Sequence, residues 1–509
     1  MIGILLNDNA YEQDIRELLM AFFPGRDFVY EEVPGLELCL VGRLNESRNQ
    51  FRMQMIFRGD HSTLIWGDSP AEQWELDHFD EPVFVDYDNR TETKNKIKRR
   101  LYAILKELTG KSLPWGSLTG IRPAKIALSC LKEGMGEQEI FDFMKTNYFA
   151  SDEKIRLCVE IAVKERELLG KVKELTLEKP DCRGMEKGYS LYVGIPFCPT
   201  TCLYCSFTSY PIDKWQGRLG EYLDALFLEL DYVAAKAGKH PSSVYVGGGT
   251  PTSLPEQELE KLMKKLTDTF DCGKALEFTV EAGRPDSITR EKLQILKKYG
   301  VTRISINPQT MNQSTLDRIG RRHKVEEVKE QFLLARELGF DNINMDLIVG
   351  LPEEDAKDLK QTMEAVKALA PDSLTVHSLA VKRAARLNTM REDYKDYKII
   401  NTQEMIQMTA QYARDMGLEP YYLYRQKNMA GNFENVGYAK PEKACIYNIL
   451  MMEEQQTVIG CGAGTTTKRV ISGENRIERA ETVKNVEQYM ERVEEMIARK
   501  ERLFGEELP

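Results

Sequence analysis

The 509-residue sequence lacks the long apolar runs of membrane proteins and the paired cysteines of secreted ones. No apolar stretch approaches the length that a bilayer-spanning helix requires. The opening residues, MIGILLNDNAYEQD, carry no basic segment, and their apolar run is too short for a signal peptide. Ten cysteines, three of them clustered, fit a reducing compartment better than a disulfide framework. We therefore expect a cytoplasmic protein without a membrane span.

A basic charge balance is also absent. Lysine and arginine number 70 against 80 aspartates and glutamates, a formal net charge of −10. Nucleic-acid backbones are bound by basic surfaces, so we expect no nucleic-acid partner. The local exception is the basic cluster formed by Lys94, Lys96, Lys98, Arg99 and Arg100. Such a helical patch can contact RNA or an anionic ligand, but a solvated helix face is the more frequent explanation.

Three cysteines stand close together in GIPFCPTTCLYCSF, residues 194–207. Cys198, Cys202 and Cys205 have the spacing Cys-x3-Cys-x2-Cys, and no fourth cysteine or histidine stands nearby to close a zinc tetrahedron. Three thiolates suit three irons of a 4Fe–4S cluster and leave one iron open. An open iron can chelate the methionine end of S-adenosylmethionine while an electron enters its sulfonium. The spacing therefore favours a radical enzyme over a zinc knuckle.

Strands and helices alternate from residue 189 onward. Six β-type segments, each reached through a helical segment, predict a parallel sheet and lie at 190–197, 242–249, 275–282, 302–309, 342–350 and 373–381. The cysteines, Gly247–Thr250, Glu281, Gln309 and Asp346 lie at or just after strand ends, which form the active face of parallel α/β barrels. The predicted fold class is α/β, with an incomplete parallel (β/α)6 barrel whose wide mouth suits a bulky substrate.

Two further regions flank the predicted barrel, which we assign to residues 181–385. Residues 1–180 mix short β-type runs with later helices, which predicts an α+β domain of unknown role. A Lys/Glu-rich stretch followed by Pro180 marks its end. Residues 386–509 are predicted to form a mostly helical cap over the substrate. The apolar residues of its last helix recur at three- and four-residue spacing, which is typical of core packing.

Six motifs follow one another in order along the barrel: GIPFCPTTCLYCSF, GGGTPT at 247–252, VEAGRPD at 280–286, RISINPQ at 303–309, RRH at 321–323 and DLIVGLP at 346–352. GGGTPT lacks the Walker lysine, so it is not a phosphate-binding P-loop. The ordered set resembles the radical S-adenosylmethionine superfamily. More narrowly, it resembles the oxygen-independent coproporphyrinogen III oxidase (coproporphyrinogen dehydrogenase) family. HSLAVKRAARL and the long N-terminal region resemble the subgroup that carries an N-terminal extension.

The resemblance implies a role for each residue that matches a family motif. It implies a 4Fe–4S cluster ligated by Cys198, Cys202 and Cys205. It implies contacts to one or two S-adenosylmethionine molecules from Tyr192, Tyr204, Gly248, Gly249, Thr250, Glu281, Gln309, Arg321, Asp346 and the backbone of Ala380. The segment GCGAGTTT, residues 460–467, resembles a glycine-rich segment that closes over the site. For the two carboxylates, a structural ion pair with Arg284, Arg303 or Arg321 is the alternative.

The reaction that the resemblance implies is oxidative decarboxylation of coproporphyrinogen III to protoporphyrinogen IX by a 5′-deoxyadenosyl radical, in heme biosynthesis. It requires an electron donor such as flavodoxin or ferredoxin, and no side chain acting as general base. A tetrapyrrole substrate bearing carboxylates needs cationic partners, and bidentate pairing favours arginine. The candidates are Arg383, Arg386 and Arg425, and an exposed basic residue without a ligand is the alternative for each.

Departures from the family pattern leave other functions open. Phe207 stands where the best-known oxidases have a fourth cysteine, a feature shared with the heme-chaperone branch of the family. That branch carries a His-Asn pair in its C-terminal region, whereas this sequence has Glu434-Asn435 there and no histidine after His377. The alternatives are a heme-binding chaperone without porphyrinogen turnover and a radical enzyme acting on another carboxylated substrate.

Overall fold

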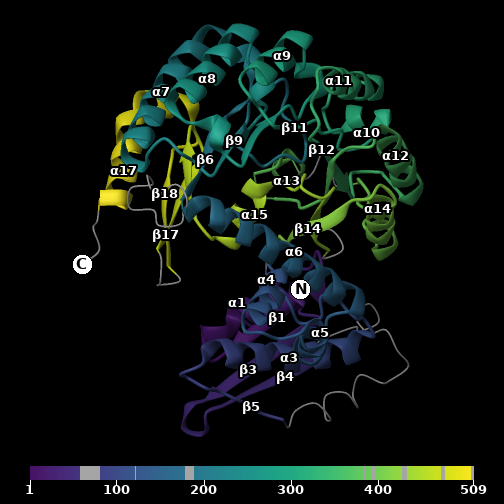
Figure 1. Cartoon of the computed structure of the whole chain (residues 1–509). Helices are drawn as coiled ribbons and strands as arrows, with labels where there is room; N and C mark the ends of the chain where they lie inside the picture. Colours follow the sequence, from purple (N-terminus) through teal and green to yellow (C-terminus); the bar gives the residue numbers. More distant parts are fainter. Residues whose placement is uncertain are drawn as a thin grey trace. The chain divides into compact units, whose positions relative to one another are not determined.

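The computed structural model describes residues 1–57, 81–120, 122–177, 188–382, 384–390, 394, 396–426, 433–471 and 476–505. The chain forms two compact units, Met1–Val159 and Glu160–Pro509. Figure 1 shows the course of the chain through its helices and strands. Within the described ranges, no helix combines the length and apolar character that a membrane crossing requires.

The first unit is built on a five-stranded sheet in the order β2-β1-β3-β4-β5. Its strands are β1 (Ile2–Leu6), β2 (Phe28–Val29), β3 (Leu38–Asn45), β4 (Gln50–Phe57) and β5 (Val83–Phe84). Its helices are α1 (Glu12–Phe22), α3 (Arg90–Thr109), α4 (Ala124–Lys132) and α5 (Glu137–Tyr148), and α6 (Asp152–Leu177) continues into the second unit. The predicted α+β composition is therefore present.

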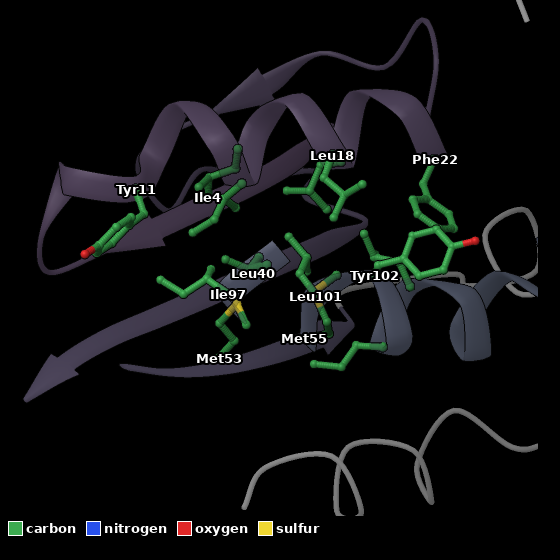
Figure 2. Packing of buried hydrophobic residues seen from close by; sticks show 14 of the residues in the cluster. Ile4, Tyr11, Leu18, Phe22, Leu40, Met53, Met55, Ile97, Leu101 and Tyr102 are labelled. Atoms are coloured by element: carbon green, nitrogen blue, oxygen red, sulfur yellow. The ribbon is translucent and has the colours of Figure 1, made fainter. Parts of the chain in front are cut away.

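The core of the first unit lies between its sheet and helices α1 and α3 (Figure 2). Ile4, Leu40 and Met53 extend from one face of the strands, because alternate strand residues share a face. Leu18 of α1 and Leu101 of α3 pack against them, and all five side chains are buried. This unit therefore has a hydrophobic core of its own.

The second unit contains an eleven-stranded sheet in the order β14-β15-β13-β12-β11-β10-β9-β6-β16-β17-β18. The six predicted strands are β6 (Tyr189–Ile195), β9 (Ser243–Gly248), β10 (Glu277–Glu281), β11 (Arg303–Ser305), β12 (Ile343–Val349) and β13 (Ser373–Ser378). Each pairs in parallel with the next in chain order. Among the described strands β13 does not pair with β6, so the predicted incomplete parallel barrel is confirmed.

Helices connect these strands and form an outer layer (Figure 1). They are α7 (Leu219–Ala237), α8 (Glu256–Thr269), α9 (Arg290–Lys298), α10 (Gln313–Arg318), α11 (Val325–Glu337) and α12 (Ala356–Leu369). In α8 the buried residues Leu259, Leu262, Met263 and Leu266 recur at helical spacing. Because each helical crossover returns the chain to the same end of the sheet, the carboxyl ends of all six strands share one edge.

The C-terminal region differs from the mostly helical cap that we predicted. It has helices α13 (Arg386–Thr389), α14 (Gln403–Asp415), α15 (Ile446–Glu453), α16 (Val486–Glu491) and α17 (Val493–Gly505). It also contributes β14 (Glu419–Tyr424), β15 (Asn435–Ala439), β16 (Thr457–Cys461), β17 (Thr466–Ile471) and β18 (Arg476–Glu481). β15 pairs antiparallel with β13 and β16 parallel with β6, so these strands extend the barrel sheet at both edges. Short apolar segments such as these become strands through pairing partners that are distant in sequence.

A buried ion pair attaches the last helix to the first helix of the barrel. Glu229 of α7 and Lys500 of α17 form this pair, and both side chains are almost completely buried. Glu229 Oε2 also accepts hydrogen bonds from Tyr489 Oη at 2.5 Å and from the Gly462 backbone N at 2.7 Å. A buried charge is tolerated when it is paired and hydrogen-bonded, so this network orders the C-terminal segment on the barrel.

We expect Lys500→Met to lower the free energy of unfolding by about 3–5 kcal/mol, because the Glu229 charge would stay buried without its partner. Urea unfolding followed by circular dichroism measures the change. Lys264→Met is the control, since the Lys264–Asp268 pair is exposed and its loss should leave stability unchanged. Equal stability of Lys500→Met and wild type would contradict the role of the buried pair.

Candidate functional site

The cysteine loop follows β6 and begins in the short strand β7 (Phe197–Cys198), which pairs in parallel with β8 (Tyr210–Pro211). Cys202 is buried, Cys198 and Cys205 are half-buried, and all three are free thiols. The Leu203 backbone N donates to the Ile319 carbonyl at 2.9 Å. The loop is therefore held against the segment that follows α10.

The glycine loop after β9 lies directly against the end of β6. The Gly249 backbone N donates to the Ile195 carbonyl at 2.7 Å, and a Cβ on Gly249 would lie 2.6 Å from the Phe197 carbonyl. Gly248 has φ of +104°, a conformation that L side chains rarely adopt. Glycine is therefore required at these two positions, and it leaves exposed backbone beside the cysteine loop.

The two loops meet at the first cysteine. Thr250 Oγ1 lies 3.4 Å from Cys198 Sγ. Burial raises the pKa of the Cys198 thiol to about 11, and the Thr250 hydrogen bond and the Arg284 charge act in the opposite direction. A buried thiol becomes a thiolate when a metal or a cation offsets the loss of solvation. Without a metal, the environment therefore holds Cys198 as a neutral thiol, which would lose its proton on binding iron.

Asn307 contacts two residues that carry carboxylates, Glu281 at the end of β10 and Asp346 in the middle of β12, where the sequence had suggested a strand end. Its Nδ2 donates to Glu281 Oε2 at 3.2 Å, and its Oδ1 accepts from the Asp346 backbone N at 3.2 Å. Burial and the Asp346 charge raise the pKa of Glu281 to about 7. Burial also opposes ionisation of Asp346, but hydrogen bonds from His377 and Asn344 outweigh it and lower the pKa. Asp346 is thus held ionised, whereas Glu281 can take up a proton near neutral pH.

Gln309 and Arg321 lie beside these groups. Gln309 has φ of +67°, its backbone N donates to the Asp346 carbonyl at 3.0 Å, and its Oε1 is buried without a hydrogen-bond partner. An unpaired buried acceptor is costly and suits a donor group of a ligand. Burial opposes the charge of Arg321, but contacts with Tyr204 and Cys202 outweigh it and raise the pKa. Arg321 therefore connects the cysteine loop with the polar residues Glu281, Asn307, Gln309 and Asp346, which we call the strand-end array.

Tyr192 belongs to an aromatic stack. Its ring centroid lies 6.0 Å from that of Tyr245 on β9 and 5.9 Å from that of Tyr447 on α15. Tyr245 and Tyr447 are themselves stacked, with 4.6 Å between centroids. Tyr245 Oη donates a hydrogen bond to Glu281. The stack thus connects Tyr192, the first of the predicted cofactor contacts, with Glu281 of the strand-end array.

The two predicted substrate arginines that the structure describes differ in exposure. Arg386 is exposed on α13, and Arg425 is buried just after β14. Arg383 lies outside the described residues. Ala380 is half-buried just after β13. Two residues after Ala380, the Lys382 ammonium lies 5.7 Å from the centroid of the Phe207 ring.

The C-terminal glycine-rich segment reaches the cysteine loop. Gly462 and Gly464 have φ of +105° and +74°. A Cβ on Gly462 would lie 2.4 Å from the Gly194 carbonyl, and one on Gly464 would lie 2.7 Å from Thr208 Oγ1. This segment therefore packs on the end of β6 and on the loop that carries the cysteines.

The structure brings four further residues into this site: Asn307, Tyr245, Arg284 and His377. Of these the sequence had indicated only Arg284, as a possible ion-pair partner of the carboxylates. Asn307 lies two residues before Gln309 in RISINPQ, and Arg284 lies in VEAGRPD, so both stood inside motifs already noticed. Tyr245 and His377 lie within strands; Tyr245 carries no motif signal, and His377 begins HSLAVKRAARL, which had been noticed only as a whole. Only the parallel register brings them beside Glu281 and Asp346.

Comparison with known proteins decides the family. The model of the radical SAM superfamily matches residues 192–366. The oxygen-independent coproporphyrinogen-III oxidase-like protein HemZ of Bacillus subtilis is 40% identical over 420 residues, which are 82% of this chain and 82% of HemZ. The chain belongs to the radical SAM superfamily and to this oxidase-like family within it. As a member, it uses a 4Fe–4S cluster and S-adenosylmethionine.

Other members of the superfamily are similar over a smaller part of the chain. The heme chaperone HemW of Bacillus subtilis is 42% identical over 195 residues, 38% of this chain and 51% of HemW. The oxygen-independent coproporphyrinogen III oxidase of Escherichia coli is 35% identical over 196 residues, 38% of this chain and 42% of the oxidase. The structure of coproporphyrinogen III oxidase (HemN) from Escherichia coli has a TM-score of 0.50 at 25% identity, and the match covers 64% of this chain and 72% of HemN.

The residues present fit both cofactors. The cysteine loop offers three free thiols, the soft donors that iron–sulfur clusters take. The glycine loop leaves no room for a Cβ at Gly249 and so packs its backbone directly beside the cysteine loop. The buried Oε1 of Gln309 has no partner within the protein and is available to a donor. Thiols, backbone and acceptor all lie at the strand ends of one barrel.

We expect Glu281→Gln to change how stability depends on pH. The pKa of Glu281 rises from 4.5 to about 7 on folding, through burial and the Asp346 charge, with Tyr245, Asn307 and Arg303 acting in the opposite direction. The folded state therefore holds the proton more tightly than the unfolded state. The stability from this group is present below about pH 4.5 and is lost as pH rises to about 7.

Urea unfolding at a series of pH values tests this expectation. Relative to wild type, the glutamine variant should gain stability across that pH window and keep a constant difference above it. Curves for the two proteins that run parallel from acidic to neutral pH would contradict the raised pKa.

Proposed function

We propose that the protein catalyses the oxygen-independent oxidative decarboxylation of coproporphyrinogen III to protoporphyrinogen IX. The observation that carries the proposal is the similarity to the oxidase-like HemZ across 82% of both chains. The Escherichia coli oxidase, 35% identical over 196 residues, supports the same substrate class. The meeting of the cysteine loop with the glycine loop at Cys198 and Thr250 supports radical chemistry at this barrel edge.

In this proposal Cys198, Cys202 and Cys205 ligate the cluster, and its fourth iron stays open to S-adenosylmethionine. When bound, the two cofactors would supply the radical chemistry that removes a hydrogen atom from a substrate propionate, and the substrate radical would then lose CO2 and pass one electron to an external acceptor. A low-potential electron donor such as flavodoxin or ferredoxin supports the cycle. The residues of the chain bind and orient the cofactors and the substrate, and they exclude water from the site, because the radical chemistry belongs to the cofactors.

The strand-end array gives S-adenosylmethionine its polar partners. Gly248, Gly249 and Thr250 present backbone and a hydroxyl to its methionine end. Asp346, held ionised, and the Oε1 of Gln309 accept hydrogen bonds from its ammonium or its ribose hydroxyls.

The remaining contacts in the proposal come from around that array. Glu281 and Arg321 complete the polar set, and Tyr204 offers an aromatic face to the adenine. Tyr192 and the backbone of Ala380 line the same site.

Arg425 is the substrate partner that the structure supports most. It follows β14, and only 5% of its surface is exposed, so its guanidinium lies in an environment where pairing with a carboxylate is strong. Arg386 is exposed and would bind a propionate only at the rim of the site. Arg383 stays a prediction from the sequence.

A heme-binding chaperone is the second candidate function. It is favoured by the 42% identity to HemW over 195 residues and by Phe207, which is 70% exposed at the position of the oxidases' fourth cysteine. The Glu434-Asn435 pair speaks against it. Both residues are buried. Asn435 Oδ1 accepts a hydrogen bond from the Ser378 backbone N at 2.8 Å, so the pair is tied to strand β13 of the sheet.

Anaerobically reconstituted protein with dithionite, S-adenosylmethionine and coproporphyrinogen III tests the proposal by mass spectrometry. We expect sequential loss of two CO2 molecules and formation of 5′-deoxyadenosine. Cys202→Ala should abolish both, while Cys272→Ala, which alters a buried cysteine outside the loop, should retain both. Stoichiometric heme binding without a vinyl product would reject the oxidase proposal and favour the chaperone.

We expect Gly249→Ala to weaken S-adenosylmethionine binding at least tenfold, about 1.4 kcal/mol. The added Cβ would meet the Phe197 carbonyl at 2.6 Å and the Ile195 carbonyl at 2.9 Å, so the loop must move. Equilibrium dialysis on reconstituted protein measures the affinity. Gly217→Ala is the matched control, because a Cβ there meets nothing within 4 Å. Equal affinities for the two variants would rule out this role of Gly249.

A further inference from the structure

Arg284, just after β10, is a buried arginine whose donors are divided between a carboxylate and the cysteine loop. Its side chain is about 3% exposed. Its Nε and Nη2 donate to the two oxygens of Asp286 at 2.9 and 2.7 Å. Its Nη1 donates to Thr200 Oγ1 at 3.0 Å and lies 3.6 Å from Cys202 Sγ. One guanidinium therefore connects the loop after β10 with the cysteine loop.

The pairing with Asp286 fixes the direction in which Nη1 points. Bidentate arginine–carboxylate contacts hold the guanidinium in one plane, so the nitrogen that remains is aimed at Thr200 and Cys202. His323 lies 4.0 Å from Asp286, but burial and the Arg321 charge lower its pKa to about 3. His323 is therefore neutral and does not compete with Arg284 for the carboxylate.

We propose that Arg284 is a positioning residue that orients Cys202 for the cluster and makes the bound cluster easier to reduce. Cysteine ligates metal as a thiolate, which accepts a hydrogen bond from a guanidinium. Reduction adds negative charge to the cluster, so a hydrogen bond and a positive charge at one sulfur stabilise the reduced form more than the oxidised form. The step transfers one electron from an external donor, and no bond to hydrogen is made or broken.

This inference rests on the cluster and is independent of which porphyrinogen the protein uses. An ion pair between Arg284 and Asp286 with a purely structural role would stabilise the fold and leave the reduction potential unchanged. The potential therefore separates the two roles, and activity is not needed to decide between them.

The test is a reductive titration of the full-length, reconstituted protein with dithionite, followed by electron paramagnetic resonance without S-adenosylmethionine or porphyrinogen. We expect Arg284→Gln to shift the reduction equilibrium about tenfold toward the oxidised form, a potential lower by about 59 mV for one electron. Arg290→Gln is the matched control, because Arg290 makes the same bidentate contact with Glu337, at 3.0 and 3.1 Å, on the exposed surface.

Arg284→Lys provides a second variant in case the glutamine variant does not hold its cluster. A single ammonium cannot bind both Asp286 oxygens and reach Cys202, so the potential should again fall while iron content stays at the wild-type level. A wild-type potential in either cluster-loaded variant would overturn the proposal. A lowered potential in the variants, together with a wild-type protein that does not decarboxylate coproporphyrinogen III, would support the role of Arg284 and reject the proposed substrate.

Discussion

Two backbone hydrogen bonds join the loop after β6 to the loop after β9: Gly249 N to Ile195 O and Thr250 N to Phe197 O, each 2.7 Å. A Cβ on Gly249 would lie 2.6 Å from the Phe197 carbonyl and 2.9 Å from the Ile195 carbonyl, so this contact requires glycine. The cysteines leave the end of β6, so their position depends on this contact. The later strands then take their places from β9 by parallel pairing, and their polar residues arrive at the same edge.

At this edge of the sheet the neutral side chain of Asn307 contacts both residues that carry a carboxylate. Asn307 hydrogen-bonds to the Glu281 carboxylate and to the Asp346 backbone N, and the Asp346 charge acts on Glu281. The consequence is a separation of their pKa values, one raised and the other lowered. On the side of the cysteines, buried guanidinium groups from Arg284 and Arg321 lie near Cys202, which offsets negative charge where thiolates form.

The C-terminal region completes the site through the sheet rather than as a separate lid. β16 continues the barrel beside β6, and the turn that follows it brings Gly462 and Gly464 against the cysteine loop. The buried Glu229–Lys500 pair and the hydrogen bond from Gly462 to Glu229 hold this turn in place. The stability of the last helix and the geometry around the cysteines are therefore linked by direct contacts.

Much of the barrel was evident in the sequence. The alternation of apolar strands with helices depends on local periodicity. The cysteine spacing and the glycine loop depend on residues that are adjacent in the chain. All three features could therefore be predicted without a structure. Predicted strand-end positions also indicated Glu281, Gln309 and Asp346, although the structure places Asp346 in the middle of β12. Their assigned roles stay proposals, because the structure reports where they lie and not what they bind.

Other features were decided only by the tertiary structure. The strands of the C-terminal region form because edges of the barrel accept them, and no periodicity within TVIGC or NVGYA reveals such partners. The contacts of Tyr245 with Glu281 and of Arg284 with Cys202 join residues that the sequence separates widely. Local chemistry determined which groups the protein carries. The pairing of distant strands decided which of them meet, because hydrogen bonds and buried charges act only over contact distances.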